Sequence, residues 1–259
     1  FNKYGDSMKD FIGKNIVVTG CTSGIGLEMV KVLDSEGVNV FAIARNEDKL
    51  TKVLGQLRFP ERHSAIIIDL KEVESIGGSA SLFPEKVHGF VHAAGVESVI
   101  PLRNLSYHMM DQIMKVNFYS FLEIVKIIAK QKKVTDDFLT SILAISSIAS
   151  GSGSKGQTLY SSSKASLEAA SVTLSKEFSR KLIRFNTVKP GLVLTEMTTR
   201  WMRTAGHSDV SEVSQLQLSG LATVSDVTNV LKFMLSDDSK HIVGTSISLD
   251  GGGPKTTLD

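Results

Sequence analysis

TGCTSGIG, residues 19–26, joins a short β-branched run, NIVVTG, to a segment near 24–36 that has the apolar pattern of a helix. Three glycines, Gly20, Gly24 and Gly26, lie in this junction. Glycine lets a backbone turn tightly and approach a ligand, and the positive N-terminal end of a helix attracts phosphate. The stretch therefore predicts a strand, a turn and a helix that bind the pyrophosphate of a dinucleotide. A tight turn without a ligand is the alternative, because three residues separate the first two glycines, unlike the usual G-x-G-x-x-G.

The rest of the chain repeats this alternation of short apolar runs and longer amphipathic ones. The apolar runs are VNVFAIA (38–44), SAIIID (64–69), VHGFVHAAG (87–95), TSILAISS (140–147), IRFNTVKPG (183–191) and TSISLDGG (245–252), and helical patterns lie near 47–57, 106–116, 117–133, 158–181 and 225–236. Short apolar strands separated by helices predict a parallel sheet covered on both faces. We expect an α/β fold, with one Rossmann-type, doubly wound domain over residues 1–259.

The polar stretch TTRWMRTAGHSDVSEVSQ (198–215) interrupts this alternation. It shows neither a clear strand nor a long helix. Such intervals are typical of binding loops and lids. We therefore expect a mobile substrate loop over 198–215.

The composition favours a small-molecule partner. The 259 residues include 29 Lys and Arg against 27 Asp and Glu, an excess too small to indicate a nucleic-acid or anionic-membrane surface. Apolar runs are far shorter than the roughly 20 residues of a membrane span, and no apolar signal core stands at the N-terminus. Cys21 is the only cysteine, so no intrachain disulfide is expected. We expect a soluble, cytoplasmic protein that binds neither nucleic acid nor membrane.

The end of the second predicted strand indicates which dinucleotide binds. NAD sites of this kind usually place an acid about 20 residues beyond the glycines, on the ribose 2′-hydroxyl, whereas an arginine suits a 2′-phosphate. Here the strand ends in Ala44 and Arg45 follows, so we expect NADP(H), with a merely solvated arginine as the alternative. Asp69 is predicted either to receive the adenine amino group or to cap a helix.

Tyr160 and Lys164, in YSSSK (160–164), are four residues apart in a predicted helix. Four residues make about one helical turn, so both side chains project from the same face. A free phenol has a pKa near 10, and a nearby cation that stabilises the phenolate brings it closer to neutral pH. The spacing therefore puts the phenol and the ammonium close enough for one charge to act on the other.

Six motifs in order resemble the classical short-chain dehydrogenase/reductases over nearly the whole chain: TGCTSGIG, HAAG (92–95), Asn117 in MKVNFYS, ISS (145–147), YSSSK and KPG (189–191). The chain is similar in particular to the bacterial 3-oxoacyl carrier-protein reductases. This resemblance implies an NADP(H)-dependent oxidoreductase that reduces a ketone, carrier-linked or sugar-linked, to a secondary alcohol.

The resemblance also implies roles for four catalytic residues. Tyr160 would protonate the carbonyl oxygen, and Lys164 would supply charge and bind the nicotinamide ribose. Ser147 matches the serine that hydrogen-bonds the substrate oxygen, with Ser146 as the competing choice. Asn117 matches an asparagine that holds a water in a proton relay to the lysine, and a bracing asparagine is its alternative.

The cofactor-binding residues that the resemblance implies are Gly20, Thr22, Ser23, Gly24, Ile25, Gly26, Arg45, Asp69, Leu70, Ala93, Ala94, Gly95, Tyr160, Lys164, Pro190, Gly191, Val193 and Thr195. The family's usual NNAG is HAAG here, so His92 and Ala93 replace two asparagines. We expect His92 to be a structural core residue, Cys21 to serve packing, and no metal site, because no other histidine stands at ligand spacing from His92.

A non-catalytic NADP-binding sensor or scaffold on the same fold is the alternative function. A nucleotide-sugar epimerase or dehydratase is a third reading, disfavoured by the chain length and the glycine spacing. The complete Tyr, Lys, Ser and Asn set favours the enzyme. The helices over 117–133 and 158–181 carry more apolar surface than one sheet face can cover, so we expect a homodimer or homotetramer.

Overall fold

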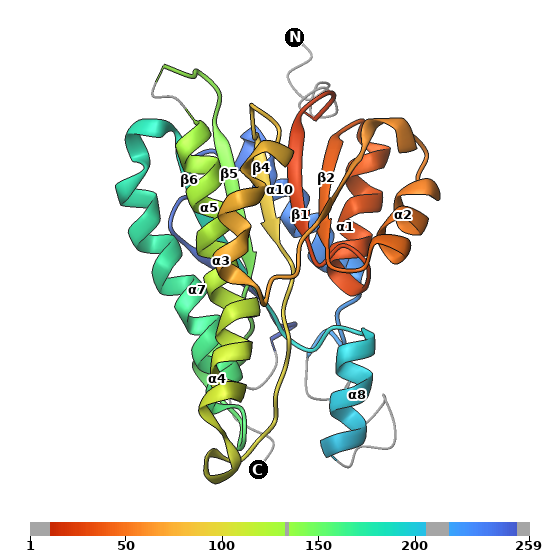
Figure 1. Ribbon diagram of the computed structural model, residues 1–259. Coiled ribbons are helices and arrows are strands. Elements are labelled where there is room, and N and C mark those ends of the chain that lie inside the picture. Colours follow the sequence, from red (N-terminus) through yellow and green to blue (C-terminus); the bar gives the residue numbers. More distant parts are fainter. Residues whose placement is uncertain (1–10, 133–134, 206–217, 253–259) are drawn as a thin grey trace.

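The computed structural model describes residues 11–132, 135–205 and 218–252, and its strands form one seven-stranded sheet in the order β3-β2-β1-β4-β5-β6-β7 (Figure 1). Every neighbouring pair is parallel. The strands are β1 (Asn15–Thr19), β2 (Asn39–Ala44), β3 (Ser64–Ile67), β4 (Gly89–His92), β5 (Thr140–Ile145), β6 (Ile183–Pro190) and β7 (Ser246–Leu249). The order reverses between β1 and β4, and ligands of such sheets bind at that point.

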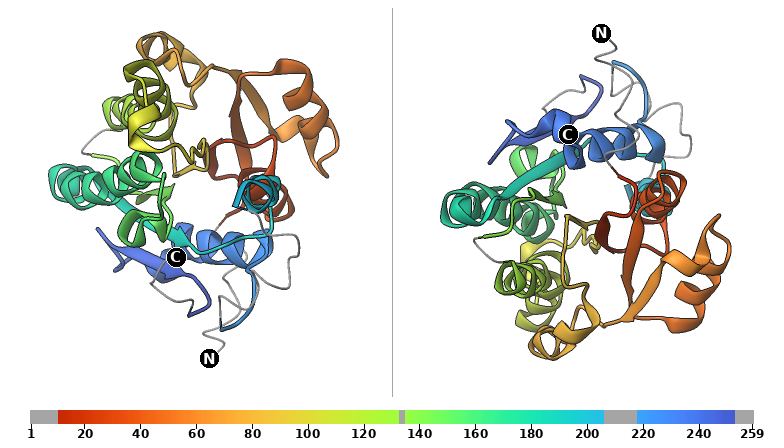
Figure 2. Two further views of the ribbon diagram at one scale, coloured as in Figure 1. Left: turned by 90° about the horizontal axis from the view of Figure 1, so that it is seen from below. Right: turned by 90° about the horizontal axis from the view of Figure 1, so that it is seen from above.

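Helices cover both faces of the sheet, as seen along the strands in Figure 2. They are α1 (Gly24–Ser35), α2 (Glu47–Gly55), α3 (Val73–Ile76), α4 (Tyr107–Met114), α5 (Ser120–Gln131), α6 (Ala149–Ser152), α7 (Thr158–Glu177), α8 (Glu196–Ala205) and α10 (Val224–Leu235). One apolar cluster joins α1, α2 and α10 to the sheet, and a second joins α5 and α7 to its other face. The doubly wound α/β fold predicted from the sequence is confirmed.

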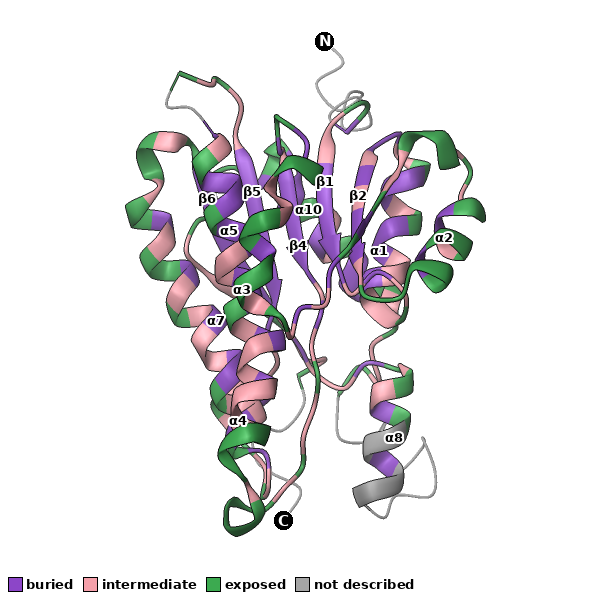
Figure 3. Ribbon diagram, in the orientation of Figure 1, coloured by how far each residue is buried: buried purple, intermediate pink, exposed green. Residues whose placement is uncertain are grey.

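The strands are the most deeply buried part of the molecule (Figure 3). All six residues of β5 and all four of β4 are buried. Successive side chains point to opposite faces of a strand. Val18 accordingly lies in the cluster with α1, and Val17 in the cluster with α5. Because both faces are covered, these strands are continuous apolar runs rather than alternating ones.

The stretch 198–215, where the sequence predicts neither a strand nor a long helix, is helical in its first part, 198–205. α8 covers Glu196–Ala205, and residues 206–215 of the expected substrate loop lie outside the described residues. Thr195 Oγ1 accepts the N–H of Thr198 at 3.3 Å and so caps the start of this helix. Thr198 and Met202, one turn apart, are both buried. Two buried positions in an otherwise polar stretch are too short a period to predict a helix from the sequence.

The two helices predicted over 106–116 and 117–133 are joined by one turn of π-helix, Lys115–Tyr119. The N–H of Ser120 donates to the carbonyl of Lys115, five residues back, and its hydroxyl donates to the carbonyl of Val116 at 2.8 Å. Single π turns inside α-helices are common at functional sites. Asn117 lies in the middle of this one and is fully buried.

The glycine turn packs closely against neighbouring backbone at the end of β1, where the strand order of the sheet reverses. A Cβ on Gly26 would lie 2.3 Å from the carbonyl oxygen of Gly20. A Cβ on Gly20, whose φ is +69°, would lie 2.7 Å from the amide nitrogen of Ala94. Both contacts are with backbone, which cannot rotate away. The end of β1, the start of α1 and the loop after β4 can therefore pack this closely only with glycine at both positions.

Gly26→Ala tests this crossing. The added methyl has no free space, and overpacking of this kind costs roughly 1–3 kcal/mol, so we expect a clear fall in the urea midpoint of unfolding. Gly55→Ala, at the end of α2, is the matched control because nothing lies within 4 Å of its Cβ position. Equal stability of Gly26→Ala and wild type would contradict the argument.

Candidate active site

The loops that carry the sequence motifs meet at the carboxyl ends of neighbouring strands. The glycine turn follows β1, Ala93 to Gly95 follow β4, Ser146 and Ser147 follow β5, and Gly191 follows β6. These four strands are adjacent in the sheet, although β2 and β3 separate β1 from β4 in the chain. The N-terminal half of α7 brings Tyr160 and Lys164 to the same end of the sheet, because Lys164 contacts the last residue of β5.

Lys164 is buried with its ammonium aimed at the end of β5. Its Nζ donates to the carbonyl oxygen of Ile145 at 2.8 Å. A Cβ on Gly95 would lie 3.0 Å from this nitrogen, so the loop after β4 needs a glycine there. Burial lowers the pKa of Lys164 to about 8. The side chain therefore stays mostly protonated at neutral pH, although much closer to deprotonation than a solvated lysine.

Tyr160 lies one turn before Lys164, and its ring centroid is 5.8 Å from the ammonium. Burial raises the pKa of Tyr160 to about 12, a hydrogen bond with Ser147 works against this rise, and the charge of Glu97 adds to it. The phenol therefore holds its proton at neutral pH, as a proton donor must. Ser147 therefore favours ionisation of the phenol, in addition to the nearby charge of Lys164.

The two serines after β5 have different neighbours. Ser147 contacts Tyr160, and its Oγ accepts the N–H of Ala149 at 3.2 Å. Ser146 faces the other way: its hydroxyl is 2.6 Å from Glu168 Oε1 and 3.2 Å from the carbonyl oxygen of Lys164. Only Ser147 therefore shares the surroundings of the phenol, which favours it over Ser146 for contact with a substrate oxygen.

The Asn117 side chain braces the loop after β4. Its Oδ1 accepts the N–H of Val96 at 2.8 Å, and its Nδ2 donates to the Val96 carbonyl and to Ser163 Oγ, each at 2.9 Å. The amide is thus fully occupied, as the bracing alternative expects. It fixes the backbone next to Gly95 and so the wall of the lysine site.

Thr19, the last residue of β1, is a buried group that the sequence reasoning missed. Its Oγ1 accepts the N–H of Ala94 at 3.2 Å and lies 3.0 Å from His92 Nδ1. A hydroxyl oxygen has two acceptor positions, so either Thr19 or the ring nitrogen can be the donor in this contact. Complete burial lowers the pKa of His92 to about 3, so the ring is neutral. His92 packs between Phe90 and Phe121, in keeping with a structural role.

The glycine turn has the shape that a pyrophosphate needs. Gly24 has a φ of +53°, and its Cβ position meets only Thr195 Cγ2, at 3.8 Å. Ser23 precedes α1 with an extended backbone, and its side chain makes no capping hydrogen bond. The first N–H groups of α1 are therefore not satisfied by that side chain. Thr22 and Ile25 are half-buried in the same turn. These residues fit a dinucleotide.

Arg45 and Asp69, the residues expected around the adenosine ribose and the adenine, have different surroundings from each other. Arg45 is exposed directly after β2, and the side chain that caps α2 belongs to its neighbour Asn46, which accepts from Lys49 at 2.7 Å. Asp69 accepts the N–H of Lys71 at 3.0 Å, so it stabilises its own turn rather than the start of α3. Leu70 is buried beside it.

The loop after β6 leads from the sheet into α8. Pro190 ends the strand, and the N–H of Gly191 donates to Leu249 of β7. Val193 forms an isolated bridge with Ala222, which holds the loop on a second side. The Thr195 hydroxyl is used in the cap of α8. These four residues therefore lie in one fixed connection that begins beside Ser146 and Ile148, which follow the neighbouring strand β5.

Three expectations concern Cys21, metal sites and membrane spans. Cys21 is buried and its thiol donates to the Ile43 carbonyl at 3.2 Å; burial raises its pKa to about 12, so the residue serves packing. Within the described part of the chain, no cluster of His, Cys, Asp and Glu could hold a metal ion. Across the same described ranges, no helix has the length and apolar character of a membrane span.

Comparison with known proteins gives consistent matches. The family model of the short chain dehydrogenases matches residues 14–206. The L-xylulose reductase of Caenorhabditis elegans is 29% identical over 246 residues, which are 94% of this chain and 96% of the reductase. The 3-oxoacyl-acyl-carrier-protein reductase FabG of Rickettsia felis is 30% identical over 249 residues, or 95% and 98% of the two chains.

Solved structures agree in fold. A short-chain type dehydrogenase/reductase from Mycobacterium ulcerans matches with a TM-score of 0.84 at 24% identity, covering 94% of this chain and 90% of that one. The family model covers well over half of the sequence, including the glycine turn and the segment with Tyr160 and Lys164. The chain therefore belongs to the short chain dehydrogenase family and is similar to its 3-oxoacyl-acyl-carrier-protein reductases.

Proposed function

We propose that the protein reduces a ketone to a secondary alcohol with NADPH as the hydride source. One observation carries the proposal: a protonated, buried phenol hydrogen-bonds a serine, one helical turn from a buried ammonium. A binding module needs none of these groups. The relatives named above are reductases of quite different compounds, a ketose and a carrier-linked 3-oxoacyl chain. Ketone reduction is the reaction those names share, so the proposal stops at that class.

The chain's own groups would divide the work as follows. NADPH, when bound, supplies the hydride. Ser147 donates a hydrogen bond to the ketone oxygen and so fixes the carbonyl beside Tyr160. Tyr160 gives its proton to the same oxygen as negative charge develops there. Lys164 keeps a positive charge near Tyr160 and the ketone oxygen. Its ammonium, which lies beside Gly95, would bind the ribose hydroxyls of the cofactor. The glycine turn and the start of α1 would hold the pyrophosphate.

Arg45 is proposed to select NADPH over NADH. Its guanidinium would pair with the 2′-phosphate, and Ala44 puts no acid there to repel it. A charge-assisted hydrogen bond contributes about 1.5–3 kcal/mol, so we expect kcat/KM to favour NADPH by roughly 10- to 100-fold. In Arg45→Ala the NADPH value should fall and the NADH value should hardly change. Equal use of both cofactors by the wild type would end this proposal.

We also propose that the protein is a homo-oligomer that packs through the outer faces of α4 and α7. Tyr107 and Met109 on α4 and Val172 on α7 are exposed apolar side chains, and the two helices lie side by side in Figure 1. Light scattering should therefore give a dimer or tetramer at micromolar concentration. Val172→Glu should shift it toward monomer, whereas Ile12→Glu, at another exposed apolar residue, should not. A wild type that is monomeric would contradict the proposal.

Tyr160→Phe separates the enzyme from a non-catalytic NADP-binding protein. The change removes one oxygen and leaves the glycine turn, Arg45 and Lys164 in place, so NADPH should bind almost as before. Loss of the proton donor should lower kcat by at least about 10²-fold. Lys164→Ala should differ in kind, because it removes a ribose contact as well and should weaken NADPH binding. Fluorescence titration and initial rates measure the two effects.

Two results would contradict this mechanism. Full activity of Tyr160→Phe would exclude the phenol as the proton donor. A wild type that binds NADPH tightly but reduces no ketone in a broad screen of carrier-linked, sugar-linked and simple ketones would favour the sensor.

A further inference from the structure

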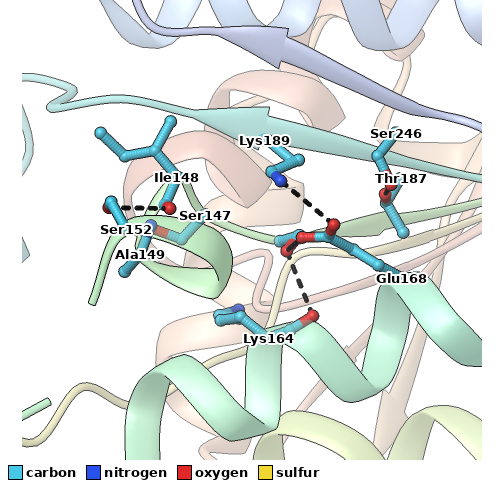
Figure 4. Close-up of polar contacts among 10 residues, drawn as sticks. Ser147, Ile148, Ala149, Ser152, Lys164, Glu168, Thr187, Lys189 and Ser246 are labelled. Atoms are coloured by element: carbon cyan, nitrogen blue, oxygen red, sulfur yellow. Dashed lines mark hydrogen bonds and ion pairs between the residues drawn. The ribbon is translucent and has the colours of Figure 1, made fainter. Parts of the chain in front are cut away.

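Glu168 lies one helical turn beyond Lys164 on α7 and points toward the sheet (Figure 4). Its Oε1 is 2.6 Å from the hydroxyl of Ser146, and its Oε2 accepts from Lys189 Nζ at 3.1 Å. The proposed mechanism uses none of these groups, although Ser146 directly precedes Ser147 and Glu168 lies one turn from Lys164.

The carboxylate joins the three segments that carry the site. Ser146 precedes Ser147 on the loop after β5. Lys189 precedes Pro190 and Gly191 at the end of β6. Glu168 itself lies on the helix of Tyr160 and Lys164. The ends of β5 and β6 are also linked by backbone hydrogen bonds, from Ser146 to Val188 at 2.8 Å and from Ile148 to Pro190 at 3.1 Å. The two strand ends therefore move as one body, and Glu168 ties α7 to it.

The ion pair is shielded from water. The side chains of Lys189 and Glu168 are 19% and 21% exposed, against 70% and 27% for Lys126 and Glu123, a surface pair on α5. Burial works to raise the pKa of Glu168, but hydrogen bonds from Ser146 and Lys189 hold it below the usual value. The carboxylate is thus charged at neutral pH. Charge-assisted hydrogen bonds of this kind are stronger than neutral ones and tolerate less change of geometry.

We propose that Glu168 is a positioning residue that, by binding Ser146 and Lys189, holds Ser147 at hydrogen-bonding distance from the Tyr160 phenol. The inference rests on the proposed ketone reduction. Ser147 and Tyr160 come from different elements, so their separation depends on how α7 sits against the end of β5. Three polar contacts set that placement, from Lys164 Nζ to Ile145 and from the Ser146 hydroxyl to Glu168 and to the Lys164 carbonyl. Ser147 takes no part in them.

Glu168→Ala should lower kcat for ketone reduction on the order of 10-fold, because a displacement of about 1 Å at reacting groups can cost up to about 10²-fold. It should also move the midpoint of the pH dependence of alcohol oxidation to higher pH. The hydrogen bond with Ser147 lowers the pKa of Tyr160, so a looser contact raises that pKa and the phenolate forms later. The dissociation constant of NADPH should stay within about twofold, because Glu168 does not touch the glycine turn.

Two further variants and a control make the test specific. Glu168→Gln keeps an acceptor for Ser146, so its kcat and pH midpoint should lie between those of wild type and Glu168→Ala. Lys189→Met removes the ammonium that binds Glu168, so its kcat and pH midpoint should also be intermediate. Glu123→Gln breaks the exposed pair with Lys126 and should leave kcat and the pH midpoint unchanged. Melting temperature is measured for each variant, so that loss of fold is recognised.

The outcomes are distinguishable. A lower melting temperature of Glu168→Ala with the kcat and pH midpoint of wild type would overturn the proposal, since Glu168 would then serve stability alone. Should Glu168→Ala fail to fold, unchanged kcat and pH midpoint in both Glu168→Gln and Lys189→Met would overturn it equally. A wild type that binds NADPH but reduces no ketone would remove the proposed function, and this inference with it.

Discussion

The burial of the Lys164 ammonium is the constraint on which the catalytic end of the sheet depends. Burial lowers its pKa from 10.5 to about 8, which corresponds to roughly 3 kcal/mol of lost solvation. The surroundings offset part of this cost in two ways. The Ile145 carbonyl accepts from the ammonium, and Gly95 leaves room for it. Any side chain on Gly95 would push the ammonium away from that carbonyl, so the loop after β4 must pass with bare backbone.

That loop is in turn fixed from three sides, and each side depends on an irregularity of the chain. Asn117 holds both backbone groups of Val96, and a π turn in the helix carries Asn117. Thr19 holds Ala94 and orients His92. Gly20 lets β1 approach Ala93 and Ala94. Local departures from regular structure at a functional site are expected, because they persist only where the surroundings determine them.

Regular features could be predicted from the sequence, and contacts between distant segments could not. The strands and long helices follow from apolar periodicity, and the glycine turn follows from residue type. The π turn has no repeating apolar pattern that would predict it. The start of α8 depends on the cap by Thr195, which cannot be recognised in a polar stretch of sequence. The amide of Asn117, the hydroxyl of Thr19 and the carboxylate of Glu168 find partners 21 to 75 residues away. Spacing along the chain carries no signal for such pairs.

The structure also adds a second contribution to the acidity of the phenol. One helical turn between Tyr160 and Lys164 suggested that the cation directly eases ionisation of the phenol. In the structure the ammonium donates to Ile145 and lies 5.8 Å from the ring centroid, and a hydrogen bond with Ser147 also lowers the pKa of Tyr160. The acidity of the phenol therefore depends on the loop after β5 as well as on the charge of the lysine. Within the proposed mechanism, the placement of α7 against β5 and β6 sets how Tyr160 lies against Ser147 and how Lys164 lies against Ile145. A group that fixes this placement without touching a substrate therefore acts on the reaction through the acid.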